Sequence, residues 1–193
     1  MAPPKNYSKS CGKKLKRVSR YWIIVILVLS GLLSPPLCAS EAGWRSIGLR
    51  AGINDNRNDE DFEQYEGFST WSLPWSWQWD SGWALDTFIE ANAGVLTADG
   101  ETGFVGSVGP GLYISIKEVV GISMGINPTL ISKHDYGDED LGGAFQFTSH
   151  IGLNAVFYDH YSLGYRLQHM SNAGFYDHNP GVNIHMLAVE YLF

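Results

Sequence analysis

The chain has 193 residues, a formal net charge of −7 and 17% charged residues, which suits a single domain of moderate size. Its 2 cysteines, Cys11 and Cys38, both lie near the N-terminus, so the remainder of the chain has no disulfide framework.

Residues 1–40 have the pattern of a secretory signal peptide. Seven Lys and Arg without any acid precede the apolar run 21–33, and small residues follow it. At about 13 residues this run is shorter than the roughly 20 of a spanning helix, which disfavours an uncleaved anchor. Leu37 directly before Cys38 disfavours a lipoprotein. We therefore expect cleavage after Ala39, Ser40 or Ala42, and a mature domain that begins at about residue 41.

Loss of this leader makes the exported part strongly acidic. Seven of the 13 basic residues leave with it, so six remain against 20 acidic residues and the net charge becomes −14. A nucleic-acid partner is disfavoured, because phosphate binding needs clustered cations.

Apolar and polar residues alternate from residue 44 onward, which predicts strands and no amphipathic helix. The alternation predicts eight strands, at 44–53, 68–79, 83–95, 104–116, 119–131, 144–157, 161–171 and 182–193. One face of the second strand carries Trp71, Leu73, Trp75, Trp77 and Trp79.

The connections between these strands alternate in length. Long or polar connections at 54–66, 97–103, 133–142 and 174–181 are separated by tight turns at 80–82, 117–118 and 158–160. Together with seven tryptophans that suit an interfacial girdle, this predicts an all-β fold: an eight-stranded antiparallel up-and-down transmembrane β-barrel in the outer membrane of a Gram-negative cell. A soluble lipocalin-like barrel is the alternative, but the Ser/Gly/Gln/Asn-rich opposite face favours a narrow polar interior.

Residue parity on the last two strands places several polar side chains on the outer wall. On 161–171, His169 and Ser171 share a face with Leu167 and other bulky residues, whereas Arg166 and Gln168 face the lumen. On 182–193, Asn183 shares its face with Leu187, Val189 and Tyr191, whereas Glu190 is lumenal and is expected to pair with Arg166.

His169, Ser171 and Asn183 should therefore face lipid near the end that carries the long loops. Polar groups facing hydrocarbon are costly unless they serve a function. A serine becomes a nucleophile when an imidazole takes its proton, and a third group must orient that imidazole. Asn172 and the backbone amides at Ala173 and Gly174 could supply oxyanion donors. This arrangement favours hydrolysis of a lipid ester, although a His-x-Ser pair on a strand is by itself weak support.

The segment 166–183, RLQHMSNAGFYDHNPGVN, resembles the signature of the lipid A 3-O-deacylase (PagL) family, with H-x-S-N-A-G followed by N-x-G. The resemblance implies an eight-stranded outer-membrane barrel that removes an ester-linked acyl chain from the lipid A of lipopolysaccharide. It implies that Ser171 is the nucleophile, His169 the base, Asn172 and the Gly174 amide the oxyanion hole, and Asn179 a supporting residue. No cofactor or metal is implied.

One position departs from the family pattern. The third catalytic member of the family is a glutamate, and Asn183 stands at that position. An asparagine carbonyl can orient the imidazole but cannot balance the charge of an imidazolium. Three interpretations follow: a working Ser-His-Asn site, an acid recruited from elsewhere such as Asp177, or a weakened enzyme.

Other functions remain compatible with the same pattern. An outer-membrane phospholipase would also suit a serine esterase site, and a non-catalytic structural or adhesive barrel would only display its loops. The acidic residues Asp135, Asp138, Glu139 and Asp140 could bind divalent cations, although a solvated loop is the simpler interpretation. The sequence leaves open which acyl chain is removed and whether the barrel forms a homodimer.

Overall fold

The computed structural model describes residues 37–39, 42–55, 58 and 60–193. Most of the predicted signal peptide (1–40) therefore lies outside the described residues. The exception is β1 (Leu37–Ala39), which pairs with the end of β3 through Leu37 opposite Trp77. Among the described residues, no helix is long and apolar enough to cross a membrane.

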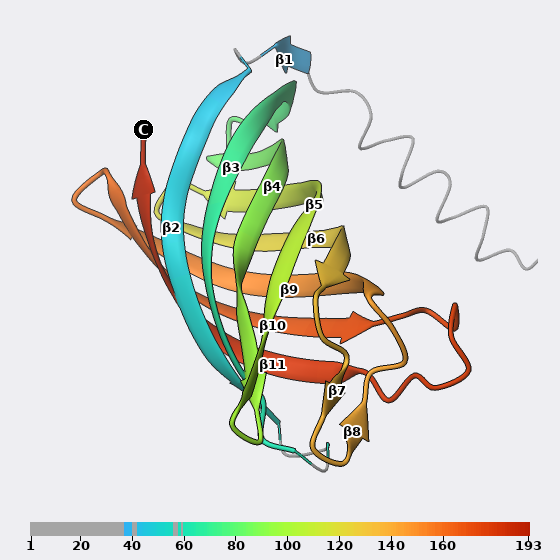
Figure 1. Ribbon diagram of the computed structural model, residues 1–193. Helices are drawn as coiled ribbons and strands as arrows, with labels where there is room; N and C mark the ends of the chain where they lie inside the picture. Colours follow the sequence, from blue (N-terminus) through green and yellow to red (C-terminus); the bar gives the residue numbers. More distant parts are fainter. Residues whose placement is uncertain (1–36, 40–41, 56–57, 59) are drawn as a thin grey trace, which may run out of the picture. The chain divides into compact units, whose positions relative to one another are not determined.

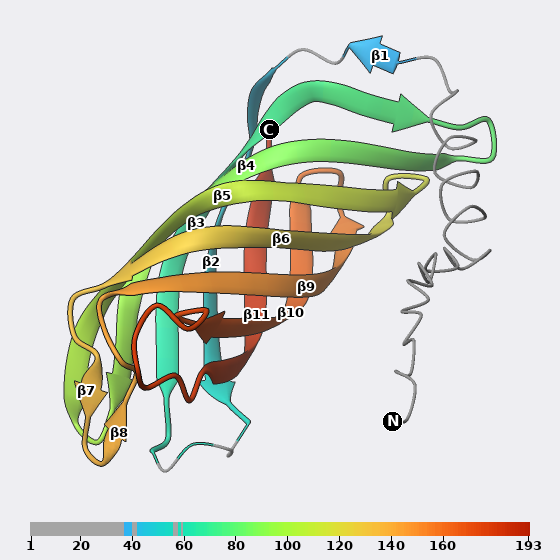
Figure 2. The same ribbon diagram turned by 90° about the vertical axis from the view of Figure 1, so that its right-hand side faces the viewer.

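Eight long strands close into an antiparallel barrel (Figures 1 and 2). Each strand pairs with its neighbours in the chain, and β11 pairs with β2 to close the ring. This confirms the predicted eight-stranded up-and-down barrel. The strands are β2 (Gly43–Asn54), β3 (Glu63–Gln78), β4 (Trp83–Ala98), β5 (Glu101–Ile116), β6 (Val120–Ile131), β9 (Phe145–Phe157), β10 (Tyr161–Ser171) and β11 (Val182–Leu192). The β6–β9 connection carries the short pair β7 (Asp135–Tyr136) and β8 (Glu139–Asp140).

Three strand ends differ from the prediction by several residues, because polar residues there were assigned to loops. β3 begins at Glu63, since Gln64 and Glu66 are buried inside the barrel and hydrogen-bond to each other (Nε2 to Oε2, 2.7 Å). β4 and β5 likewise extend until Ala98 pairs with Glu101, so the predicted loop 97–103 is a tight turn. Polar residues that face the barrel interior thus belong to the strands, although a prediction from polarity assigns them to loops.

The outer wall is apolar as parity predicted. On β10 the side chains of Leu163 and Leu167 are exposed, whereas Arg166 and Gln168 are buried. On β11 Leu187 and Val189 are exposed and Met186 is buried. Aromatic side chains ring the end that carries the tight turns, as expected for an interfacial girdle; the exposed ones are Trp44, Trp71, Trp75, Trp83, Phe157, Tyr158, Tyr161, Tyr191 and Phe193.

The interior is less uniformly polar than the sequence suggested. At the loop end it holds an apolar cluster, because Phe62 and Tyr136 turn inward from two loops and stack edge-to-face at 5.4 Å between ring centroids. Side chains from the strands complete this cluster: Leu96, Ala98, Val105, Ile131, Leu141, Met170, Val182, Ile184 and Met186. The loops therefore close this end of the barrel with a small hydrophobic core.

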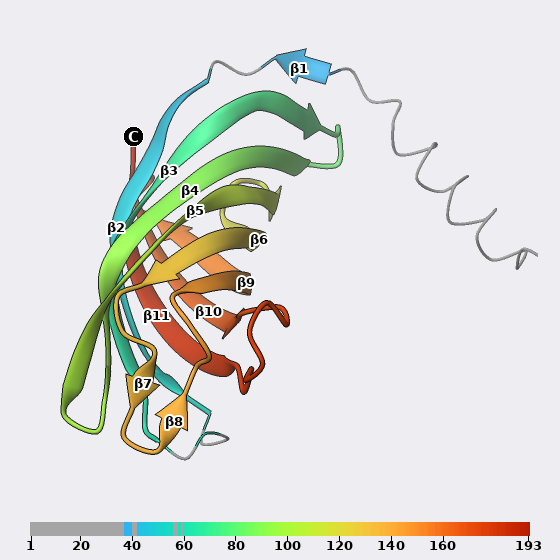
Figure 3. The same cartoon turned by 45° about the vertical axis from the view of Figure 1, so that its right-hand side comes forward.

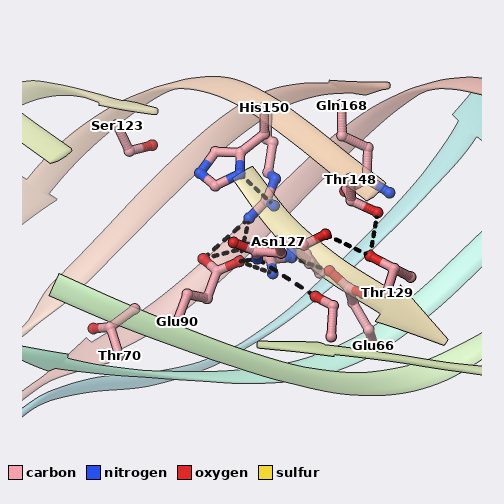
Figure 4. A network of polar contacts seen from close by, with 12 residues as sticks. Glu66, Thr70, Glu90, Ser123, Asn127, Thr129, Thr148, His150 and Gln168 are labelled. Atoms are coloured by element: carbon pink, nitrogen blue, oxygen red, sulfur yellow. Dashed lines mark hydrogen bonds and ion pairs between the residues drawn. The ribbon is translucent and has the colours of Figure 1, made fainter. Parts of the chain in front are cut away.

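A buried ion network lies in the middle of the barrel (Figure 4). The Glu90 carboxylate accepts hydrogen bonds from Arg50 (Nη2 to Oε1, 2.9 Å) and from Arg166 (Nη1 to Oε1, 2.8 Å). Arg50 also binds Glu66, and Arg166 donates to His150 Nδ1 at 2.8 Å. The expected Arg166–Glu190 pair is therefore wrong: both side chains are lumenal, but Arg166 reaches the middle of β4 instead. Together with Gln168, which donates to Gln64 at 2.9 Å, Arg166 anchors the inner face of β10.

Neutralising Glu90 should destabilise the barrel strongly. Glu90→Gln leaves two buried guanidinium groups without their shared counter-ion, which should lower the free energy of unfolding by about 3–5 kcal/mol. Urea denaturation in detergent, followed by tryptophan fluorescence, measures this change. The matched variant Glu118→Gln, at an exposed turn, should stay within about 0.5 kcal/mol of the parent. Equal midpoints for the two variants would show that the network does not stabilise the barrel.

Candidate active site

Strand β10 presents His169 and Ser171 on the outer wall, near the long-loop end. His169 is exposed and Ser171 half-buried. Strand pairing sets Asn183 of β11 directly opposite His169 on one side, and Phe147 of β9 opposite Ser171 on the other. The three site residues predicted from parity are thus on adjacent strands and on one face.

Asn183 is hydrogen-bonded to the histidine. The Asn183 Oδ1 atom lies 2.8 Å from His169 Nδ1, and the Asn183 Nδ2 group donates to Asp55 Oδ2 at 3.2 Å. The backbone amide of Asp55 also donates to the carbonyl of Asn183 at 3.2 Å. A row from His169 through Asn183 to Asp55 therefore runs along the rim of the barrel, away from Ser171.

Within the described part of the chain, no hydrogen bond joins the hydroxyl of Ser171 to the His169 ring. Nucleophile–base contacts are often long in free enzymes and shorten when substrate binds. Because residues i and i+2 of a strand share a face, the side chains of Ser171 and His169 lie on the same side of β10.

The connection after Ser171 is held together by Asn172, which is fully buried. Its Nδ2 group donates to the carbonyls of Leu141 (3.2 Å) and His178 (2.7 Å), and its Oδ1 accepts from the Gly174 amide at 2.9 Å. The backbone amide of Asn172 donates to Asn179 Oδ1 at 3.0 Å. Asn172 thus joins the 172–181 connection to the β6–β9 connection, which carries β7 and β8, at the same end of the barrel (Figure 3).

These bonds bear on the expected oxyanion donors. The side chain of Asn172 and the amide of Gly174 donate within the loop in this structure. Across the described residues, the Ala173 amide and the Asn179 Nδ2 group donate no hydrogen bond, and both lie in the connection that begins at Ser171. Ala173 has a φ of 53°, in the left-handed region, and it lies two residues after Ser171.

The backbone of Gly181 lies close to the imidazole ring of His169. Its φ is 68°, and a Cβ atom placed on it would lie 2.8 Å from His169 Cε1. Its carbonyl accepts from Asn58 Nδ2 at 2.9 Å. The glycine of the family's N-x-G motif therefore leaves room for the ring, and the β2–β3 connection fixes that glycine in place.

Three phenylalanines lie beside Ser171. Phe147 stacks on Phe175 with ring centroids 6.0 Å apart, and Phe145 packs against Phe147 edge-to-face at 5.1 Å. Phe175 is 68% exposed. This aromatic surface adjoins Ser171 on the side away from His169, where an acyl chain can lie against it.

The acidic loop forms its own contacts. His134 Nδ1 lies 3.1 Å from Asp140 Oδ1, and Asp135 is also near this ring at 3.5 Å. The backbone amide of Gly142, and then His134, lower the pKa of Asp140. His134 is half-buried and the two aspartates are exposed; their possible ligand atoms lie close enough together to hold a cation, but their hydrogen bonds already explain the cluster.

The lipid A 3-O-deacylase (PagL) family model matches residues 63–192. This chain belongs to the lipid A 3-O-deacylase family. It is 35% identical over 151 residues to a lipid A deacylase PagL of Bordetella bronchiseptica, covering 76% of this chain and 83% of the relative. It is 29% identical to the lipid A deacylase PagL of Pseudomonas aeruginosa, covering 61% and 75%. The crystal structure of the outer membrane enzyme PagL superposes with a TM-score of 0.66 at 23% identity, covering 75% of this chain and 97% of that one.

Membership of the lipid A 3-O-deacylase family confirms the family predicted from the sequence, and the superposition confirms the barrel. Asp55 and Asn58 were missed, because they lie in a polar loop more than a hundred residues before the motif that they contact. Nothing in a single sequence marks such residues, since closure of the barrel through β2 and β11 brings them to the site.

Proposed function

We propose that this protein hydrolyses the ester bond at position 3 of lipid A, with Ser171 as nucleophile and His169 as base. The observation that carries this proposal is the 2.8 Å contact between His169 Nδ1 and Asn183 Oδ1 on the outer wall of the barrel. His169 lies two residues before Ser171 on the same strand. Membership of the lipid A 3-O-deacylase family supports the choice of substrate and bond.

The reaction follows the logic of a serine hydrolase. His169 Nε2 takes the proton of Ser171 while the Ser171 oxygen attacks the ester carbonyl. The resulting oxyanion accepts hydrogen bonds from the backbone amide of Ala173 and from the Nδ2 group of Asn179, which the structure leaves available. The bond between the carbonyl carbon and the sugar oxygen then breaks, and His169 gives its proton to that oxygen, which leaves as a hydroxyl group of the sugar.

Water completes the cycle. His169 removes a proton from a water molecule, which attacks the acyl-serine ester and releases the fatty acid from Ser171. All the groups that this scheme requires come from one chain, so a homodimer is not needed for chemistry.

The placement of the site suits a substrate that arrives from the side. Long loops of such barrels face the exterior, so His169 and Ser171 lie at the level of the outer leaflet. An acyl chain of lipid A can follow the aromatic surface of Phe145, Phe147 and Phe175 while its ester reaches Ser171. Such an approach needs no opening in the barrel wall.

Mass spectrometry of lipid A tests the proposal. Lipopolysaccharide incubated with the purified barrel should lose the mass of one hydroxyacyl chain, and the free hydroxy fatty acid should appear. Phospholipid vesicles incubated in parallel should remain intact. Unchanged lipid A with hydrolysed phospholipid would indicate a phospholipase, and two unchanged substrates would indicate a non-catalytic barrel.

A further inference from the structure

We propose that Asp55 is a positioning residue of the active site, which fixes the orientation of the Asn183 amide and thereby the tautomer of His169. The inference rests on the proposed function of His169 as a base. It explains how an asparagine can serve at the position where the resemblance to the lipid A 3-O-deacylase family implies a glutamate.

The first step concerns hydrogen-bond donors and acceptors. A carboxylate can only accept hydrogen bonds, so the Asn183 group that faces Asp55 must be the Nδ2 donor. The Oδ1 atom of the same amide then faces His169, and an oxygen there requires the ring to donate from Nδ1. The lone pair is left on Nε2, the nitrogen that must accept the proton of Ser171.

Without the hydrogen bond to Asp55, the Asn183 amide could take either of two orientations toward His169. Rotated by half a turn, Asn183 would present Nδ2 to the ring, and the ring would carry its proton on Nε2. That tautomer cannot act as base toward Ser171, and the wrong tautomer is what makes an amide in place of the aspartate so damaging in a serine protease triad. Asp55 therefore removes the main defect of an asparagine at this position.

The backbone holds Asp55 where the argument needs it. β2 and β11 pair up to Asn54 opposite Ile184, and the next contact is the 3.2 Å bond from the Asp55 amide to the carbonyl of Asn183. The two side chains therefore come from directly joined backbone segments at the end of a paired strand. Asp55 is also half-buried, so its charge is screened less than that of a fully exposed acid.

The carboxylate of Asp55 also brings a negative charge close to the Asn183–His169 pair. When His169 becomes an imidazolium, Asn183 Oδ1 accepts from it and Asn183 Nδ2 donates to Asp55, so the amide connects the cation to the anion. Removing the charge of Asp55 should therefore weaken the stabilisation of the imidazolium that forms during the reaction.

The test compares Asp55→Asn with the matched control Asp61→Asn, which removes an exposed charge from the same connection. Asp55→Asn should lower kcat on lipid A by about 10- to 100-fold with little change in KM. Asp61→Asn should leave both unchanged. Heat-modifiable gel mobility reports folding of each variant.

A second-site exchange separates positioning from a general structural role. In an Asn183→Glu background the glutamate faces Asp55 directly, and two adjacent carboxylates repel each other. Asp55→Asn should then raise activity, the opposite of its effect beside Asn183. Loss of activity in both backgrounds, or in neither, would overturn the proposal.

Nitrogen NMR reads the tautomer without any turnover. In the full barrel with ¹⁵N-labelled histidine, His169 should show a protonated Nδ1 and an unprotonated Nε2, and Asp55→Asn should shift it toward the mixed tautomers of free imidazole. His169→Gln assigns its signals among the six histidines. An unchanged tautomer in Asp55→Asn would refute this inference alone, whereas a parent protein without deacylase activity would refute the proposed function.

Discussion

Ser171→Ala is expected to abolish release of the 3-linked acyl chain while the barrel still folds. Without the hydroxyl there is no nucleophile, and removal of the serine in a comparable hydrolase lowers kcat by roughly 10⁶-fold. An alanine on the half-buried outer face is compatible with lipid, so stability should hardly change. Release of hydroxy fatty acid from lipopolysaccharide measures the loss, with heat-modifiable mobility as the folding control.

The matched control for this variant is Ser149→Ala. Ser149 lies on the outer face of β9, opposite His169, and it is exposed. It loses the same hydroxyl from the same wall, yet full activity is expected. If Ser171→Ala retained more than a few per cent of the parent rate, the nucleophile would have to be another group.

Asn183→Leu should have the next largest effect, a fall in kcat of about 10³- to 10⁴-fold. Leucine offers nothing to His169 Nδ1, so both the ring orientation and its tautomer are lost. It also breaks the contact with Asp55. The rate is measured on lipid A as for the serine variant, across a pH range so that a shifted optimum is not mistaken for a loss.

His185→Leu provides the comparison, because His185 lies on the same face of β11, two residues along. Its Nδ1 contacts the hydroxyl of Tyr165 at 2.5 Å, away from the His169–Asn183 pair. Activity should persist in this variant. A folded Asn183→Leu protein with undiminished activity would remove Asn183 from the mechanism and direct attention to Asp177.

The architecture could be predicted from the sequence because alternation along each strand carries the information. Leu163, Arg166 and Leu187 take the faces that parity assigns, since one buried and one lipid-facing surface make a strand pattern unambiguous. Strand ends were harder, because Gln64 and Glu66 are polar and yet lie inside the barrel. The partner of Arg166 could not be found either, since Glu90 is 76 residues away and several lumenal acids compete for it.

The site was predictable where it is local in sequence. His169 and Ser171 are two residues apart on one strand, and the connection that returns on β11 brings Asn183 opposite His169. Asp55 lies at the site because β2 pairs with β11 to close the barrel. The sequence motif around His169 and Ser171 contains no information about that pairing. The hydrogen bonds of Asn172 within its loop depend equally on Leu141 from another connection.

The closed loop end of the barrel limits the routes by which the products of hydrolysis can leave. The apolar cluster at the loop end and the Glu90 network in the middle of the barrel interrupt any continuous pore. Neither the detached fatty acid nor the trimmed lipid can therefore leave through the barrel, and both must diffuse away within the outer leaflet. The attacking water arrives from the opposite direction, over the rim. The enzyme thus works at the membrane surface, where it takes its lipid substrate from the outer leaflet and its water from the aqueous phase.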